Sequence, residues 1–266
     1  MLKSLIRTLT KGKVTSVSDE GGYPRFCEKA LHDERAFASF RRHPVYQEIL
    51  DHVTREQGRD YLNLIERRYP HLLDHLDLFK VNDRLGGPFT HEYRGTGSIS
   101  PSTLRYVKVL GDLEALFGDT REMVIAEIGG GYGGQCRLIS AYLGFAAYVI
   151  VDLEPCLGLA KKYLHQLGVE GVSFQTMSHL RSDGIYDLVI SNYAFTECTR
   201  EVQEGYLDRV LARSARGYLT CNQIAPKKYR IHSRQELLDS LPGSHILPEE
   251  PLTHDLNCIL VWGNKS

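Results

Sequence analysis

Several features are missing from this sequence, and each absence excludes a class of protein. The 266 residues include 32 basic and 33 acidic side chains, a formal charge of −1, so no positive excess is available to hold a polyanion through release of counterions. We therefore expect no nucleic-acid partner. No run approaches the ~18 to 20 apolar residues that cross a bilayer. Internal repeats and low-complexity tracts are also absent.

Cysteine is scarce and scattered. The six cysteines form no C-x-x-C pair and no grouping with histidine at the spacing of metal ligands. This favours reduced, buried thiols in a cytoplasmic protein. The first 13 residues, MLKSLIRTLTKGK, lack the unbroken apolar core of a signal peptide. Their leucines at helical spacing among basic residues leave a weak contact with an anionic membrane surface open, although docking on the protein itself is the preferred interpretation.

The chain divides into two parts. Apolar residues recur at three- and four-residue spacing over residues 26–80, which predicts helices with breaks at Gly58 and Pro70. Residues 81–103 are rich in Gly, Pro, Ser and Thr, and their apolar residues follow neither the helical nor the strand period. This predicts a loop of the length that often forms a lid. We expect a helical region with a lid-like loop over residues 1–95 and a second domain over residues 96–266.

Strands and helices alternate beyond residue 101. A helix is predicted from Pro101 to Gly118, and a capping box of Ser233 and Glu236 predicts another near the end. Such alternation with helices of ~10 to 15 residues is typical of a parallel, doubly wound sheet, whose ligands bind beyond the carboxyl ends of the strands. The predicted strands are MVIAEIG, AAYVIVDLE, GVSFQTM, YDLVISNY, GYLTCNQI and NCILVWG, and the helices between them include GQCRLISAYLG, PCLGLAKKYLHQLG and REVQEGYLDRVLARSA.

The first strand-to-helix turn, in VIAEIGGGYGGQ, is dense in glycine. Gly129, Gly131 and Gly134 satisfy G-x-G-x-x-G, and Asp152 ends the next strand about 20 residues later, as in dinucleotide-binding folds. Glu127, just before the first glycine, would face the crevice, repel a pyrophosphate and attract a cation. S-adenosylmethionine carries a sulfonium and an ammonium and no phosphate, so the charge favours it over NAD.

These residues resemble a known family. AEIGGGYGGQ followed by VDLEP is similar to the first two motifs of the class I S-adenosylmethionine-dependent methyltransferases. Over residues 81–263, NDRLGGP, SPSTLRYVKVLGDLEALFG, SNYAFTEC, GYLTCN and EEPLTHDLNCILVWG resemble the sugar O-methyltransferases of bacterial surface-polysaccharide gene clusters. The resemblance implies an α/β, Rossmann-like doubly wound sheet of seven strands with an antiparallel last strand, preceded by a small helical region. It also implies methylation of a sugar hydroxyl of a glycan or glycoconjugate precursor.

The resemblance implies one S-adenosylmethionine site at the ends of successive strands. Asp152 would accept hydrogen bonds from the ribose hydroxyls, and Asn192 would lie near the reacting methyl group. Ordinary core packing of Leu153 and a turn cap at Asn192 are the structural alternatives. The expected cofactor residues are Glu127, Gly129, Gly131 and Gly133 at the methionine end, Asp152 at the ribose, Leu153, Met177 and Ser178 at the adenine, and Asn192.

Methyl transfer to a hydroxyl requires a base that takes its proton. Glu197, after the fourth strand, would lie above the methyl group, or else it supplies an acidic first turn to the following helix. His91 and Asp83, in the loop before the second domain, are the other candidate catalytic residues, with His254 as a further option. A divalent cation held by Glu197, Glu249, Glu250 and Asp255 is open but unsupported by their spacing.

Three other functions stay open. An NAD-dependent oxidoreductase would use the same glycines, although Glu127 opposes it. An amino-group methyltransferase is a second option, but SNYAF lacks both prolines of the N-P-P-Y motif. A binding module without catalysis is the third. The acceptor is expected to be a small sugar or a glycoconjugate, and a homo-oligomer remains open.

Overall fold

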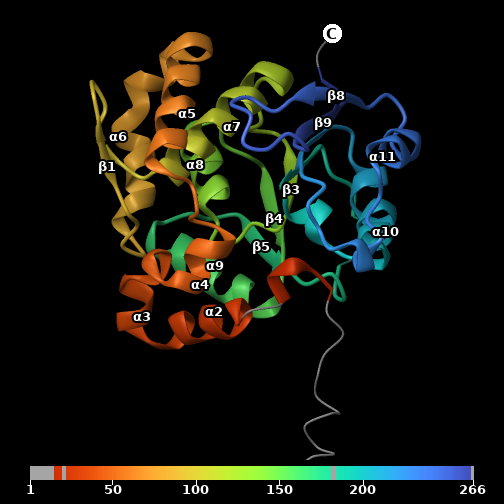
Figure 1. Ribbon diagram of the computed structural model, residues 1–266, viewed down its shortest axis with the longest axis horizontal. Coiled ribbons are helices and arrows are strands. Elements are labelled where there is room, and N and C mark those ends of the chain that lie inside the picture. Colours follow the sequence, from red (N-terminus) through yellow and green to blue (C-terminus); the bar gives the residue numbers. More distant parts are fainter. Residues whose placement is uncertain (1–14, 20–21, 181–183, 265–266) are drawn as a thin grey trace, which may run out of the picture.

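The computed structural model describes residues 15–19, 22–180 and 184–264, and its centre is a mixed sheet of seven strands (Figure 1). The N-terminal stretch with the predicted membrane-surface contact lies outside the described residues. The strands run in the order β5-β4-β3-β6-β7-β9-β8. They are β3 (Val124–Ile128), β4 (Ala147–Val151), β5 (Val172–Gln175), β6 (Leu188–Asn192), β7 (Gly217–Cys221), β8 (His245–Pro248) and β9 (Cys258–Trp262).

The directions of the strands confirm the predicted fold class. Strands β3 to β7 are parallel, and the last strand, β9, runs antiparallel to both β7 and β8. The order reverses at β3, because the chain adds β4 and β5 on one side of it and β6 on the other. The loops that leave β3 and β6 therefore diverge, which opens a crevice at the carboxyl edge of the sheet.

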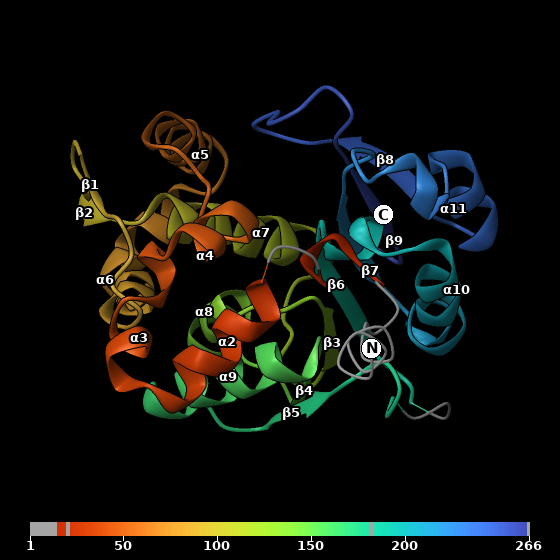
Figure 2. The same cartoon turned by 60° about the horizontal axis from the view of Figure 1, so that its bottom comes forward.

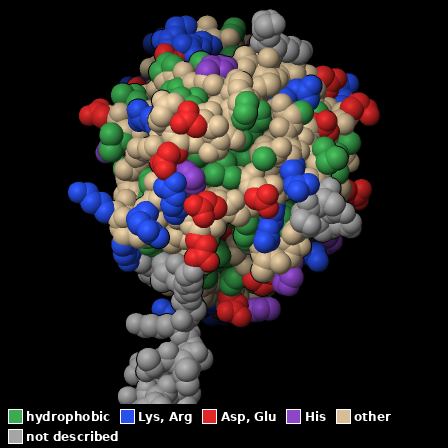
Figure 3. Space-filling model, turned by 90° about the vertical axis from the view of Figure 1, so that its right-hand side faces the viewer, with side chains coloured by type: hydrophobic (Ala, Val, Ile, Leu, Met, Phe, Trp, Pro, Cys, Tyr) green, Lys and Arg blue, Asp and Glu red, His purple; other side chains and the backbone are tan. Residues whose placement is uncertain are grey.

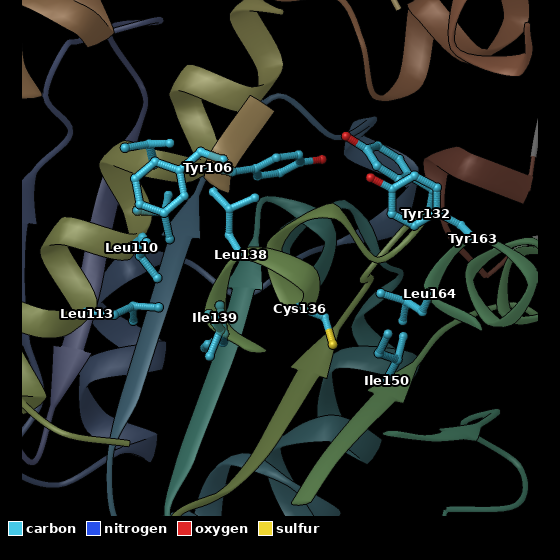
Figure 4. Packing of buried hydrophobic residues seen from close by; sticks show 14 of the residues in the cluster. Tyr106, Leu110, Leu113, Tyr132, Cys136, Leu138, Ile139, Ile150, Tyr163 and Leu164 are labelled. Carbon is cyan, nitrogen blue, oxygen red and sulfur yellow. The ribbon is translucent and has the colours of Figure 1, made fainter. Parts of the chain in front are cut away.

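Helices cover both faces of the sheet (Figure 2). One face carries α7 (Pro101–Phe117), α8 (Gly134–Tyr142) and α9 (Glu154–Gln166), and the other carries α10 (Arg200–Arg209) and α11 (Arg234–Ser240). Successive strand residues supply the two cores, because side chains alternate across a strand. Ile125 of β3 belongs to the first core and Ala126 to the second. Figure 4 shows leucines of α7 and α8 packed over the strands.

The helices ahead of the sheet join the first core. They are α2 (Tyr23–His32), α3 (Glu34–Ala38), α4 (Pro44–Ile49), α5 (Arg55–Arg68) and α6 (Leu76–Phe79). Helix α5 begins with a capping box of Thr54 and Gln57 and packs on α7. Helix α7 is consequently buried almost all round, since it lies between α5 and the sheet. The boundary expected between residues 95 and 96 stays a prediction.

Three strands went unpredicted. Residues 81–103, expected to be a loop, contain the hairpin of β1 (His91–Tyr93) and β2 (Gly97–Ile99), whose three-residue strands are too short to show a period. Strand β8 is an edge strand with mostly exposed side chains, so its sequence HILP lacks the apolar run of a buried strand. The other predicted strands and helices of residues 101–263 are confirmed, and so is the Ser233 capping box.

All six cysteines are buried and unbridged, as expected. Acidic and basic side chains are interspersed on the face that carries α10 and α11 (Figure 3), which agrees with the balanced composition. Of the helices in the described ranges, none is long and apolar enough to cross a bilayer.

Candidate functional site: a pocket at the carboxyl edge of the sheet

A cavity of about 1020 Å³ lies where the parallel strands end. Its lining includes the residues at or just beyond the carboxyl ends of all five parallel strands, namely Ile128, Val151, Thr176, Asn192 and Asn222. Thr15 to Ser18 also line it, held by a backbone bridge between Ser16 and Cys198. Pockets for small ligands occupy about 300 to 1,000 Å³, so this one has room for a large ligand or for two smaller ones.

One set of lining residues, named the strand-end wall, lies at or just beyond the carboxyl ends of strands β3 to β6. It comprises Ile128, Gly129, Gly131, Asp152, Leu153, Met177, Ser178 and Asn192. Seven of the nine residues expected to bind the cofactor are thus brought together here.

The glycines of the strand-end wall let the backbone approach closely. Gly129 has φ +72°, and a Cβ atom there would lie 2.0 Å from Cβ of Ala194. Gly131 has φ +56°, and a Cβ atom there would lie 2.9 Å from a methyl group of Leu50. Both positions combine a left-handed backbone with crowding, so glycine is required twice over.

Asp152 stands at the centre of this wall. Its Oδ2 accepts a hydrogen bond from the Gly131 N–H at 3.0 Å, and its Oδ1 accepts one from the Leu153 N–H at 2.7 Å. Burial raises the pKa of Asp152 to about 6, while these two hydrogen bonds act in the opposite direction. An ionised carboxylate has about four acceptor sites, so two remain for donors on a ligand.

Glu127 lies beneath the glycine loop instead of facing the crevice as expected. It is 2% exposed and accepts a hydrogen bond from Tyr148 Oη at 2.9 Å. Burial raises the pKa of Glu127 to about 7, partly offset by that hydrogen bond. Gly133 is likewise absent from the lining, because it caps α8 with φ +86° and packs against Leu164. Cofactor contacts of these two residues stay predictions.

A second set of lining residues, named the composite wall, is assembled from distant parts of the chain. Its polar members come from the segment between α4 and α5, from α5, from α7 and from the ends of β6 and β7. They are His52, Tyr61, Arg105, Tyr193, Glu197 and Asn222.

Glu197 is an acidic residue of the composite wall. It ends the short 3₁₀ helix Ala194–Glu197, three residues before α10 begins, so it is not part of the first turn of α10. Asn222 Nδ2 donates a hydrogen bond to its Oε1 at 2.8 Å. Burial raises the pKa of Glu197, and the Asn222 hydrogen bond opposes this shift. A carboxylate with raised pKa in a pocket can accept a proton from a ligand.

Tyr193 is held in an unusual conformation. Its φ of +69° lies in the left-handed region that non-glycine residues rarely adopt. Its hydroxyl donates to Glu249, which is itself buried and accepts from Thr253 and Asn257. Such strain persists only where the surroundings impose it, and it is common at functional sites.

The structure separates two of the other candidate catalytic residues, Asp83 and His91, from Glu197. Asp83 accepts hydrogen bonds from Arg41 Nη1, the Ser100 N–H and Thr103 Oγ1, and it does not line the cavity. His91 lines a different hollow of about 120 Å³. His254 does line the large pocket. Of the loop over residues 81–103, no residue contributes to its lining, and the lid role stays a prediction.

The four carboxylates considered as metal ligands do not converge. Glu249 is engaged by Tyr193, and Glu250 pairs with Arg68. Over residues 15–19, 22–180 and 184–264, no group of three or more His, Cys, Asp or Glu side chains could hold a metal ion.

Sequence reasoning missed His52, Tyr61, Arg105 and Asn222. A weak signal for Arg105 existed, because it is one of four charged residues, with Lys108, Asp112 and Glu114, in the helix that precedes the glycine loop. The others lie in segments with no motif, and only the packing of α5 against α7 brings Tyr61 to the pocket.

Comparison with known proteins finds no matching family model and no matching curated protein. The chain does resemble solved structures. The likeness is one of fold. An rRNA methylase from Streptococcus thermophilus is 16% identical, with a TM-score of 0.44, over 59% of this chain and 94% of that one. A magnesium protoporphyrin IX methyltransferase from Synechocystis PCC 6803 is 18% identical, with a TM-score of 0.43, over 59% and 74%. A mutant of MtNAS, solved with S-adenosylmethionine, is 19% identical, with a TM-score of 0.45, over 89% and 87%.

Proposed function

We propose that this protein is an S-adenosylmethionine-dependent O-methyltransferase that acts on a sugar hydroxyl of a glycan or glycoconjugate precursor. The observation that carries the proposal is the position of Asp152. Its carboxylate lies at the end of β4, supports the glycine loop through Gly131, and shares one pocket with Glu197. Under this proposal, Asp152 binds the ribose diol of the cofactor and Glu197 accepts the proton of the acceptor hydroxyl within the same cavity.

The strand-end wall has the groups to hold the cofactor. Asp152 would accept hydrogen bonds from both ribose hydroxyls, and Leu153, Met177 and Ser178 would surround the adenine. Gly129 and Gly131 leave space for the methionine end. The cofactor supplies a methyl group on a positively charged sulfur, so the residues around it need only align the acceptor with that carbon.

The composite wall has the groups to activate the acceptor. Glu197 would take the proton of the hydroxyl as the new bond forms, and Asn222 fixes the orientation of its carboxylate. The raised pKa of Glu197 makes it a stronger base than an exposed glutamate. The rings of Tyr61 and Tyr193 offer apolar surface against which a sugar can pack.

The buried acid beneath the loop favours this cofactor over NAD. A pyrophosphate docked at the start of α8 would approach the carboxyl of Glu127, which lies beneath Gly130. A sulfonium compound carries no phosphate and avoids that repulsion.

Isothermal titration with S-adenosylhomocysteine and, separately, with NAD tests the proposal. We expect micromolar binding of S-adenosylhomocysteine and none of NAD. The reverse result would overturn the proposal. With binding established, mass spectrometry of a panel of sugars incubated with S-adenosylmethionine identifies the acceptor as a gain of one methyl group on oxygen.

A further inference from the structure

Arg105 is a buried cation that faces the pocket. It lies in the second turn of α7, is 7% exposed and belongs to the lining of the large cavity. Its Nη2 donates to the Leu50 carbonyl at 3.1 Å, and its guanidinium lies 5.5 Å from the centre of the Tyr106 ring. Its Nε–H is buried and has no hydrogen-bond partner within the described part of the chain.

Arg41, another buried arginine, has the carboxylate partners that Arg105 lacks. Arg41 is fully buried, and it donates to Asp51 from Nε and Nη2, to Asp83 from Nη1 and to Ser100 from Nη2. Arg105 has no carboxylate within ion-pair distance among residues 15–19, 22–180 and 184–264. Burying a guanidinium without a counter-ion costs several kcal/mol, so such groups are rare unless something pairs with them.

The neighbours of Arg105 do not neutralise it. Burial raises the pKa of Tyr61 to about 12, and it also raises the pKa of Tyr193, so both phenols are uncharged at pH 7. His52 also lines the cavity, but an imidazole carries no negative charge in either protonation state. Two carboxylates act on Arg105 electrostatically without pairing with it. Asp51 is already engaged by Arg41, and Glu197 accepts from Asn222.

We infer that Arg105 is an anion-binding residue of the pocket, which pairs with a carboxylate or phosphate of a bound ligand. The planar guanidinium suits such groups, since it donates two parallel hydrogen bonds to them. The inference rests on the proposed function for the identity of that ligand. The anion is either the carboxylate at the amino-acid end of the cofactor or an acidic group of the acceptor.

The position of Arg105 fits both sources. Leu50, whose carbonyl it holds, lies against Gly131 of the glycine loop, so the guanidinium is near the expected methionine end. Arg105 also acts electrostatically on Glu197, the proposed base beside the acceptor.

The test compares wild type, Arg105→Gln and Arg105→Lys. Arg137→Gln is the matched control, because Arg137 is 5% exposed and also donates to a backbone carbonyl, that of Leu78, but does not line the cavity. Thermal unfolding verifies that each variant is folded. Titrations use S-adenosylhomocysteine and 5′-methylthioadenosine, which lacks the amino-acid end. Inorganic phosphate and acetate are then added to the unliganded protein and to protein saturated with S-adenosylhomocysteine, while the backbone amide signals of Leu104 and Tyr106, on either side of position 105, are followed by NMR at constant ionic strength.

Two results support the inference and distinguish the sources. If Arg105 holds the cofactor, Arg105→Gln lowers the affinity for S-adenosylhomocysteine by about 10-fold or more and leaves the affinity for 5′-methylthioadenosine unchanged. If Arg105 holds the acceptor, S-adenosylhomocysteine binds Arg105→Gln normally, and phosphate or acetate shifts the amide signals of Leu104 and Tyr106 saturably in the loaded wild type but not in loaded Arg105→Gln. Arg105→Lys keeps the charge but lacks the planar pair of donors, so its affinity for the anion should lie between the affinities of wild type and Arg105→Gln.

Unchanged binding of every probe in Arg105→Gln, or an equal loss in Arg137→Gln, would overturn the inference. Failure of the proposed function looks different, because neither adenosine compound would then bind wild type. In that case the phosphate and acetate titrations of the unliganded protein still decide whether Arg105 binds an anion.

Discussion

The two walls of the pocket are built in different ways. The strand-end wall comes from the ends of four strands, β3 to β6, and backbone geometry dominates it, through left-handed glycines and a carboxylate bonded to two N–H groups. The composite wall draws single side chains from segments between residues 52 and 222, and buried or partly buried polar groups dominate it. The first arrangement suits a constant ligand, and the second suits a ligand that differs from one protein to another. Mutations in the strand-end wall should therefore affect binding of the cofactor, and mutations in the composite wall should affect the reaction with the acceptor.

The largest effect is expected at Glu197. Glu197→Gln should lower turnover by about 10² to 10⁴-fold, because the amide cannot take the proton of the acceptor, while affinity for S-adenosylhomocysteine stays unchanged. Since burial raises the pKa of Glu197 and a base must be ionised, wild-type turnover should fall as the pH drops through this raised value. Initial rates from pH 5 to 9 measure both, with the exposed Glu204→Gln as control. Full activity of Glu197→Gln would assign the base to His254.

Gly129→Ala tests the backbone of the strand-end wall. The left-handed φ should cost about 1 to 2 kcal/mol and the clash with Ala194 a further ~1 to 3 kcal/mol of unfolding free energy, with loss of cofactor binding. Gly168→Ala is the matched control, because it has φ +69° and open space around the added methyl group. Urea denaturation should show only the first cost there. Equal losses in both variants would mean that Ala194 does not confine the loop.

Glu127 makes the stability of the strand-end wall depend on pH. The pKa of Glu127 in the folded protein, about 7, exceeds its pKa in the unfolded chain. The contribution of Glu127 to the free energy of unfolding is therefore complete at low pH and is lost as the pH rises toward 7. Relative to wild type, Glu127→Gln should therefore gain up to about 3 kcal/mol of unfolding free energy between pH 5 and pH 8. Urea unfolding at both pH values measures this gain. Parallel pH curves would show that Glu127 is ionised throughout.

The smallest effect is expected at Asp152. Asp152→Asn should weaken the binding of S-adenosylhomocysteine by about 1 to 3 kcal/mol, because charge-assisted hydrogen bonds to the ribose are lost. Binding of an acceptor should not change. Because the pKa of Asp152 is about 6, wild-type affinity should decrease below that pH, and the affinity of the variant should not. Isothermal titration at pH 5 and 8 checks both, with the exposed Asp239→Asn as control. Equal affinities would place the ribose elsewhere.

The accuracy of the sequence predictions follows the same division. The alternation of strands and helices and the antiparallel last strand were correct. Gly129, Gly131, Asp152 and Asn192 line one pocket, and their role in binding a cofactor stays a prediction. Errors occurred where local pattern is weak, at the hairpin β1–β2 and at the edge strand β8. The orientation of Glu127 was also wrong, because Tyr148 on the neighbouring strand draws its carboxylate under the loop.

The sequence by itself determined the strand-end wall, because consecutive strands of a parallel sheet end at one edge. A short motif after such a strand lies at that edge regardless of how the helices pack. Only the tertiary structure decided the composite wall. Arg105, Tyr61 and Glu197 meet because α5, α7 and the end of β6 share one densely packed surface. That arrangement depends on the burial of many apolar side chains at once, and no local spacing encodes it.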